Sequence, residues 1–127
     1  MNPDDRRYHA EHEWVKVTDD GLAVIGITDF AQRQLGEIVF VELPEVGSTL
    51  NAGQVYGEVE SVKSVSELYA PVTGQVTQVN SILSDSPETV NAEPYGEGWI
   101  VKVQMSDTQA LDSLMTSAQY STHIGEG

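Results

Sequence analysis

The stretch VYGEVESVKSVSELYA, residues 55–70, decides the fold. Over residues 55–62, apolar or small residues alternate with polar or aromatic ones, and this period of two is typical of a β-strand. Residues 65–70 form a second strand-like run, which ends at Pro71. Lys63 and Ser64 therefore lie at the turn of a predicted β-hairpin.

Further short strands are predicted on both sides of this hairpin. Thr28 and Gly36 frame a short helix over residues 29–35, because threonine is favoured at N-caps and glycine at left-handed C-caps. Prolines and glycines make residues 81–98 irregular. The other predicted strands cover residues 14–18, 22–27, 38–43, 75–79 (opened by Gly74) and 99–104.

The C-terminal part predicts a short amphipathic helix. Ser106 with Gln109 fits a capping box, and apolar residues follow at helical spacing. Many short strands with so few helices favour a mainly β fold, a sandwich or barrel, over βαβ units. The length predicts one domain over 1–127, with flexible ends at 1–7 and 121–127. The apolar residues of this C-terminal helix are Leu111, Leu114, Met115 and Ala118.

The composition excludes several classes of function. Six Lys and Arg against 20 Asp and Glu give a net charge of −14, which disfavours nucleic acid and anionic membranes as partners. The absence of cysteine excludes disulfides, thiolate nucleophiles and most zinc sites. No apolar run is long enough to span a membrane, and the first residues do not resemble a signal peptide, so a cytoplasmic protein is expected.

Catalytic motifs are lacking in the sequence. It contains no Gly-rich phosphate loop, no GxSxG and no HExxH. The three histidines, His9, His12 and His123, are too scattered to predict a metal site. His12, between Glu11 and Glu13, could act as a general base, but a partly exposed histidine near the start of a strand is the favoured interpretation.

The three lysines carry more information. Lys16 and Lys102 lie within strand patterns and are expected to face solvent. Lys63 lies at the hairpin turn, between small or β-branched neighbours. A charged residue at a turn is usually only solvated. The alternative is a lysine displayed for covalent modification, because a protruding turn can enter the active site of a modifying enzyme without unfolding.

Several separate stretches carry a family resemblance. They are HEW (12–14), GITDFAQRQLGEIVFVELPEVG (26–47), VESVKSVSELYAPVTGQVTQVN (59–80) and EPYGEGWIVKV (93–103). The hairpin is similar to the attachment hairpin of biotinyl/lipoyl carrier domains, and most of residues 8–120 resembles the H protein family of the glycine cleavage system. The resemblance implies a barrel-sandwich hybrid of short strands with a few short helices, and lipoate in amide linkage to Lys63. The Ala-Met-Lys-Met pattern of biotin carriers is absent.

The resemblance also implies roles for residues around Lys63. Glu60, Gly47 and Gly74 match positions that the lipoate-attaching enzyme recognises, three before, 16 before and 11 after the lysine. The glycines are expected to allow tight turns that fix the hairpin. Glu13 and Glu67 match positions near a cleft that shelters the loaded arm. The alternative for these residues is a turn, a strand start or a solvated charge.

A carrier without catalytic residues of its own is thus the implied function. Its partners would be a pyridoxal-phosphate-dependent glycine decarboxylase, a tetrahydrofolate-dependent aminomethyltransferase and dihydrolipoyl dehydrogenase. Two alternatives stay open, namely an H-like protein that holds lipoate for relay or another oxidation pathway, and an enzyme that uses its own side chains. Trp14, Tyr95 and Trp99 are expected to be packing residues. The predicted core around the hairpin comprises Val59, Val62, Val65, Leu68 and Val72.

Overall fold

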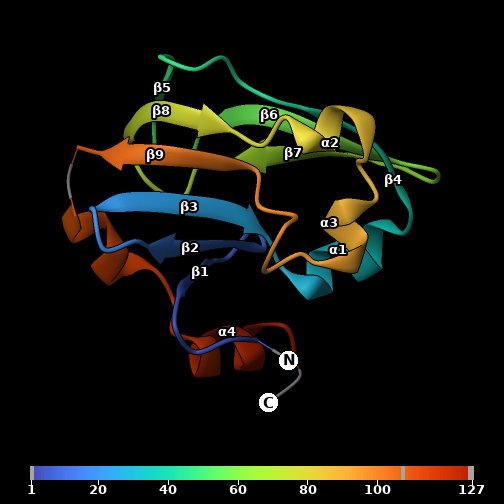
Figure 1. The fold of residues 1–127 in the computed structure, drawn as a ribbon. Helices are drawn as coiled ribbons and strands as arrows, with labels where there is room; N and C mark the ends of the chain where they lie inside the picture. Colours follow the sequence, from blue (N-terminus) through green and yellow to red (C-terminus); the bar gives the residue numbers. More distant parts are fainter. Residues whose placement is uncertain (1, 107, 126–127) are drawn as a thin grey trace.

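The computed structural model describes residues 2–106 and 108–125, and the side chains of 108–110 lie outside the description. The chain folds into two antiparallel β-sheets with short helices at one end and beneath them (Figure 1). This confirms the predicted mainly β fold. The larger sheet has the strand order β1-β2-β3-β9-β8-β5, and the smaller has the order β4-β6-β7.

The predicted strands are all present with bounds close to those expected, while β1 and β5 were not predicted. The Asp19-Asp20-Gly21 turn joins β2 to β3, and Gly21 adopts a φ of 83°, which glycine tolerates without steric cost. The strands are β1 (Arg7–His9), β2 (Glu13–Val17), β3 (Leu22–Ile27), β4 (Ile38–Glu42), β5 (Thr49–Leu50), β6 (Val55–Ser61), β7 (Val65–Tyr69), β8 (Gly74–Val79) and β9 (Val101–Met105).

The first helix is the one that its caps predict. The Thr28 hydroxyl accepts the Ala31 amide at the start of α1 (Asp29–Leu35), and Gly36 ends the helix with a φ of 82°. Residues 81–98, predicted to be irregular, instead contain α2 (Ile82–Asp85) and α3 (Thr89–Ala92). Each of these helices has four residues, too few for an amphipathic period to be visible in the sequence.

The C-terminal helix lies later than predicted. A 3-10 helix, η1 (Thr108–Ser113), comes first, and α4 (Ser117–His123) follows. The two are separate because Met115 is extended and exchanges two backbone hydrogen bonds with Tyr8 of β1. The capping box is formed by Thr116 and Gln119. The box expected between Ser106 and Gln109 involves a side chain outside the described residues.

Two buried clusters hold the fold together. Nineteen buried side chains fill the space between the sheets, with Ile25, Val59 and Val103 fully inaccessible. Tyr8, Trp14 and Tyr120 form a second cluster, which packs α4 against β1 and β2. None of the helices in the described residues is long and apolar enough to cross a membrane.

The flexibility expected for residues 1–7 and 121–127 stays a prediction. Described residues of both ends do make contacts: Arg7 lies in β1, and the Asn2 amide donates to the Ser121 hydroxyl at 2.9 Å. The first described residues therefore lie beside α4.

Candidate functional site at the β6–β7 turn

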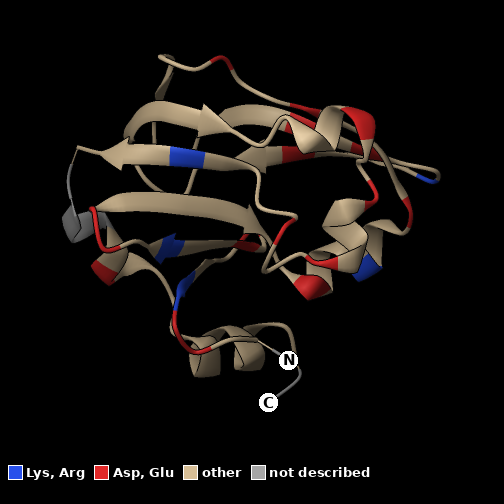
Figure 2. Ribbon diagram, in the orientation of Figure 1, with Lys and Arg blue, Asp and Glu red and all other residues tan. Residues whose placement is uncertain are grey.

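The β6–β7 hairpin reaches out from the end of the molecule, and its turn is residues 62–64 (Figure 1). The Ser61 amide donates to the Ser64 carbonyl at 2.8 Å, and the Ser61 hydroxyl accepts the amides of Lys63 and Ser64 at 3.3 and 3.1 Å. These bonds give the turn a defined backbone. The predicted position of Lys63 at a hairpin turn is confirmed, and Figure 2 shows a basic residue at this tip.

The exposed Lys63 side chain rests against the end of helix α1. A Cβ placed on Gly36 would lie 3.2 Å from Lys63 Cε and 3.9 Å from Nζ, so the lysine stem runs over bare glycine backbone. The Val62 amide also donates to the Glu37 carbonyl at 3.0 Å, which ties the turn to this loop. Sequence reasoning assigned Gly36 only a capping role and missed its contact with the lysine.

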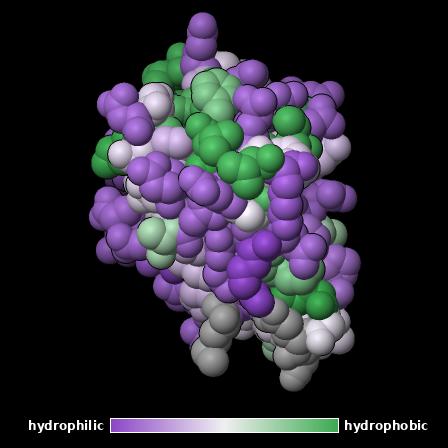
Figure 3. Space-filling view, turned by 90° about the vertical axis from the view of Figure 1, so that its right-hand side faces the viewer, coloured by the Kyte–Doolittle hydropathy of each residue, from purple (hydrophilic) through white to green (hydrophobic). Residues whose placement is uncertain are grey.

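Apolar side chains surround the lysine at the tip. Val62 and Val65, predicted as core, are 66% and 58% exposed. Val62 is in the turn, and Val65 lies opposite Glu60 on the outer face of the smaller sheet, so the strand pattern does not bury either of them. Val59, Leu68 and Val72 are buried as predicted. Figure 3, which views the molecule from this end, shows apolar side chains among polar ones.

A cleft of about 290 Å³ lies between α1 and β7. One wall is α1, with Phe30 and Leu35, and the opposite wall is β7, with Leu68. Leu35 directly precedes Gly36, on which the lysine rests, so a group attached to Nζ would reach the cleft. Carboxylates of Glu11 and Glu67 also line it. The cleft therefore combines an apolar interior with anionic groups.

Glu67 is one of the residues that line this cleft. It is exposed, lines the cleft, and accepts a hydrogen bond from the Tyr69 hydroxyl at 3.3 Å. In the strand register Glu67 is opposite Glu58, and Glu58 is opposite Glu42. Three carboxylates thus form one row across the outer face of the smaller sheet. Gln34, a neutral amide, also lines the cleft.

Glu13 lies in the interior and is not among the residues that line the cleft. Its side chain is 1% exposed, and neither carboxylate oxygen has a hydrogen-bond partner among the described residues. The Tyr56 hydroxyl is likewise buried without a partner. Burial raises the pKa of Glu13 well above its usual value, although the nearby Tyr69 amide lowers it in part. The alternative of a solvated surface charge is therefore wrong for Glu13.

The three predicted recognition residues do not gather at the tip. Glu60 is half-buried on β6, opposite Phe40 and Val65. Gly47 has a φ of 94°, and its amide and carbonyl bond to β8, so it lies close to Gly74.

Gly74 is buried, and a Cβ there would approach Val103 Cγ1 to 2.6 Å. Gly47 therefore allows a left-handed turn, and Gly74 allows close packing of β8 on β9. Neither glycine lies in the hairpin itself, and the expectation that their turns hold the hairpin in place stays a prediction.

A metal centre has no support in the described residues. No group of three His, Asp or Glu side chains there could hold a metal ion. The chemistry available to this site is that of an accessible primary amine beside an apolar cleft with anionic side chains.

The fold and the displayed lysine define a domain of the carrier class, in which a hairpin presents one amine for attachment of a group. A family model described as Glycine cleavage H-protein matches residues 6–127. A glycine cleavage system H protein of Bacillus velezensis is 59% identical over 93% of this chain and 92% of its own length. One of Staphylococcus epidermidis is 53% identical over 98% of both chains.

A solved structure agrees with these sequence relationships. The crystal structure of a glycine cleavage system H protein from Mycobacterium marinum superposes with a TM-score of 0.90 at 45% identity, over 97% of this chain and 98% of that one. The chain belongs to the glycine cleavage H-protein family. H proteins are carrier subunits of that system and not its catalysts.

Proposed function

We propose that this chain carries lipoate in amide linkage to Lys63 and shuttles the aminomethyl group of glycine. The observation that carries the proposal is the exposed Lys63 amine at a hydrogen-bonded turn between two strands. The lipoyl group would supply the disulfide chemistry that a chain without cysteine lacks. Amide formation removes the lysine charge, so the net charge changes from −14 to −15.

The cleft beside Lys63 is the proposed resting place of the loaded arm. Its apolar walls would exclude water from the cargo, and Glu67 would pair with the cationic amine. Glu13 is a deeper candidate partner, because its buried carboxyl has no hydrogen bond among the described side chains. Ionisation of this carboxyl becomes more favourable when a cation lies nearby.

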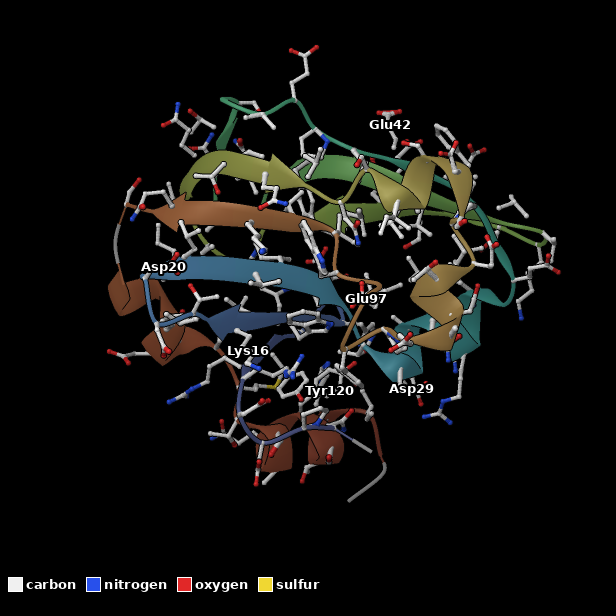
Figure 4. All side chains as sticks on the ribbon, in the orientation of Figure 1. Lys16, Asp20, Asp29, Glu42, Glu97 and Tyr120 are labelled. Carbon is white, nitrogen blue, oxygen red and sulfur yellow. The ribbon has the colours of Figure 1, made fainter. Side chains whose placement is uncertain are left out.

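The proposed partners are glycine decarboxylase, aminomethyltransferase and dihydrolipoyl dehydrogenase, which the carrier would visit in turn. The row of Glu42, Glu58 and Glu67 lies on the outer face of the sheet that presents the lysine, and Figure 4 labels Glu42. Such a row favours partners with basic surfaces near their active-site entrances, and it would raise association rates more than affinity. The expected cytoplasmic location, and the expected lack of nucleic-acid and membrane partners, stay predictions.

Recognition by the lipoate-attaching enzyme is proposed to involve Glu60, Gly47 and Gly74. Glu60 is the one of the three that lies on the hairpin itself, three residues before the target lysine. The glycines would act at a distance, since both shape the edge where β5 meets β8.

Intact mass with peptide mapping tests the proposal. Protein from cells supplied with lipoate should carry one lipoyl group on Lys63. Lys63→Arg should abolish the modification, while Lys16→Arg and Lys102→Arg, which change the other two lysines, should leave it intact. The Lys63→Arg protein should also fail to support glycine–CO2 exchange by the decarboxylase. Full exchange activity with this variant would refute the carrier function.

A further inference from the structure

His12 has an unusual backbone conformation. Its φ is 72°, and no other described residue except glycines has a positive φ. Such a conformation costs free energy and persists where surrounding contacts hold it, often at functional sites. Here both backbone groups are engaged, since the His12 amide donates to the His9 carbonyl at 2.9 Å and the His12 carbonyl accepts the Thr28 amide at 3.0 Å.

The His12 side chain is also held by a chain of hydrogen bonds. Its Nδ1 lies 2.8 Å from the Tyr120 hydroxyl, which lies 2.8 Å from the Thr28 hydroxyl. Thr28 caps α1, and Tyr120 comes from α4 (Figure 4). Tyr120 and Thr28 are fully buried. The imidazole orientation is therefore fixed by hydrogen bonds to the protein interior, which come from α4 and from the start of α1.

The His12 side chain also lines the cleft. His12 lines it together with Phe30, whose ring centroid is 4.9 Å away. The titratable groups around His12 are Glu11 and Glu67, which line the cleft, and His9 of β1 and His123 of α4. Burial, and then the His123 ring, lower the pKa of His12, while Glu11 opposes this shift. Burial and the His123 ring therefore favour the neutral form of the imidazole.

We infer that His12 is a binding residue of the cleft, a neutral imidazole that contacts the amine of the docked cargo and is oriented by Tyr120 and Thr28. This inference rests on the proposed function. An ammonium group is stabilised by carboxylates and by neutral acceptors, and a protonated imidazole would repel it. The shelter of the cargo should therefore weaken as the pH falls through the pKa of His12.

Ammonia release from loaded protein, without folate, tests the inference. His12→Asn suits the site because asparagine tolerates positive φ, which keeps the turn while removing the imidazole. We expect release about fivefold to tenfold faster, the size of one lost hydrogen bond. Tyr120→Phe should act in the same direction. Tyr8→Phe is the matched control, since Tyr8 is equally buried and stacks on Tyr120 at 4.9 Å but bonds to Pro3 instead.

A second readout does not depend on release. NMR titration should show a lower pKa of His12 in loaded protein than in lipoylated protein without cargo, because the amine adds a positive charge. The His9 pKa should stay unchanged. Wild-type release rates in both His12→Asn and Tyr120→Phe, or an unchanged His12 pKa on loading, would overturn the inference. Absence of lipoate from Lys63 in the wild-type chain would instead refute the proposed function.

Discussion

Glu13 and Trp14 are neighbours on β2, and their side chains lie in opposite environments. The Trp14 indole donates to the carbonyls of Ile27 and Pro94 at 3.0 and 2.9 Å, and the Arg6 guanidinium lies over its ring at 4.6 Å. Both Glu13 oxygens, by contrast, are buried without a hydrogen bond among the described residues. Successive side chains of a strand face opposite sides, so one strand serves two different regions.

The surroundings of Trp14 and of Glu13 indicate which parts of the molecule stabilise the fold and which serve its function. In the Trp14 region, packed rings join β1, β2 and α4, and the Trp14 indole bonds to the Ile27 carbonyl, as expected for a stabilising core. Elsewhere the molecule keeps a buried acid, Glu13, that has no hydrogen-bond partner among the described residues. It also keeps exposed apolar residues at the lysine tip and a row of like charges on the smaller sheet. Variants at Trp14 and its packing neighbours should lower stability. Variants at the cleft should change the chemistry of the carrier, and a variant at Glu13 should change the pH dependence of stability.

Trp14→Ala should have the largest effect on stability. Removing a fully buried indole leaves a cavity and two unbonded carbonyls, and should lower the free energy of unfolding by about 3–5 kcal/mol. Urea denaturation measures this loss. Lys63→Arg, on the exposed tip, should stay within about 0.5 kcal/mol of the parent. Equal losses for the two variants would erase the distinction between the regions.

Gly26→Ala tests how tightly the Trp14 region is packed. A Cβ on Gly26 would come within 2.6 Å of Trp14 Cζ2, so the indole would have to move. We expect a loss of about 1–3 kcal/mol in the free energy of unfolding, the usual cost of overpacking. Gly96→Ala is the control, because its Cβ would meet only the Glu93 side chain, at 3.3 Å from Oε1. A neutral Gly26→Ala would mean that the cluster is loosely packed.

Glu13→Gln tests the unpaired acid through the pH dependence of stability. An acid whose pKa is higher in the folded protein binds more protons when folded, so the free energy of unfolding falls as the pH rises above the usual value of 4.5. One proton contributes a slope of at most about 1.4 kcal/mol per pH unit. Glu13→Gln should remove that slope and be more stable than the parent at neutral pH.

Thermal or urea unfolding at several pH values measures the Glu13 effect. The parent protein, measured at the same pH values, is the reference. If the pH dependence of the free energy of unfolding persisted in Glu13→Gln, another titratable group would be its cause.

Glu67→Ala should give the smallest effect, and only on the cargo. Loss of the cleft carboxylate should speed ammonia release from loaded protein severalfold while stability stays within about 0.5 kcal/mol. Glu58→Ala is the control. Glu58 is the cross-strand neighbour of Glu67 but does not line the cleft, so this variant should leave the release rate unchanged. Equal acceleration by both would point to the net charge of the sheet and not to the cleft.

Local patterns were enough to predict most of the fold. The span of β3 and the caps of α1 are as the sequence predicts, because alternation and capping are properties of adjacent residues. The C-terminal helix was misplaced because Ser106 and Thr116 both precede a glutamine by three residues, and only pairing of Met115 with Tyr8 decides between them.

The candidate site was predicted less completely, for physical reasons. Lys63 was visible because a strand pattern stops and resumes around it. The burial of Glu13 was not, because a carboxylate ordinarily indicates a solvated position. The contact of His12 with Tyr120 joins residues 108 positions apart, and the contact of Lys63 with Gly36 depends on how a helix end meets a turn. Neither leaves a periodic signal.

The row of Glu42, Glu58 and Glu67 places like charges directly opposite one another, an arrangement that weakens the pairing of their strands. Dissolved salt screens such repulsion, and it screens attraction to a basic partner in the same way. Higher ionic strength should therefore stabilise this sheet and slow the first encounter with a basic partner. The solution that best preserves the isolated protein is then not the one in which it meets such a partner fastest.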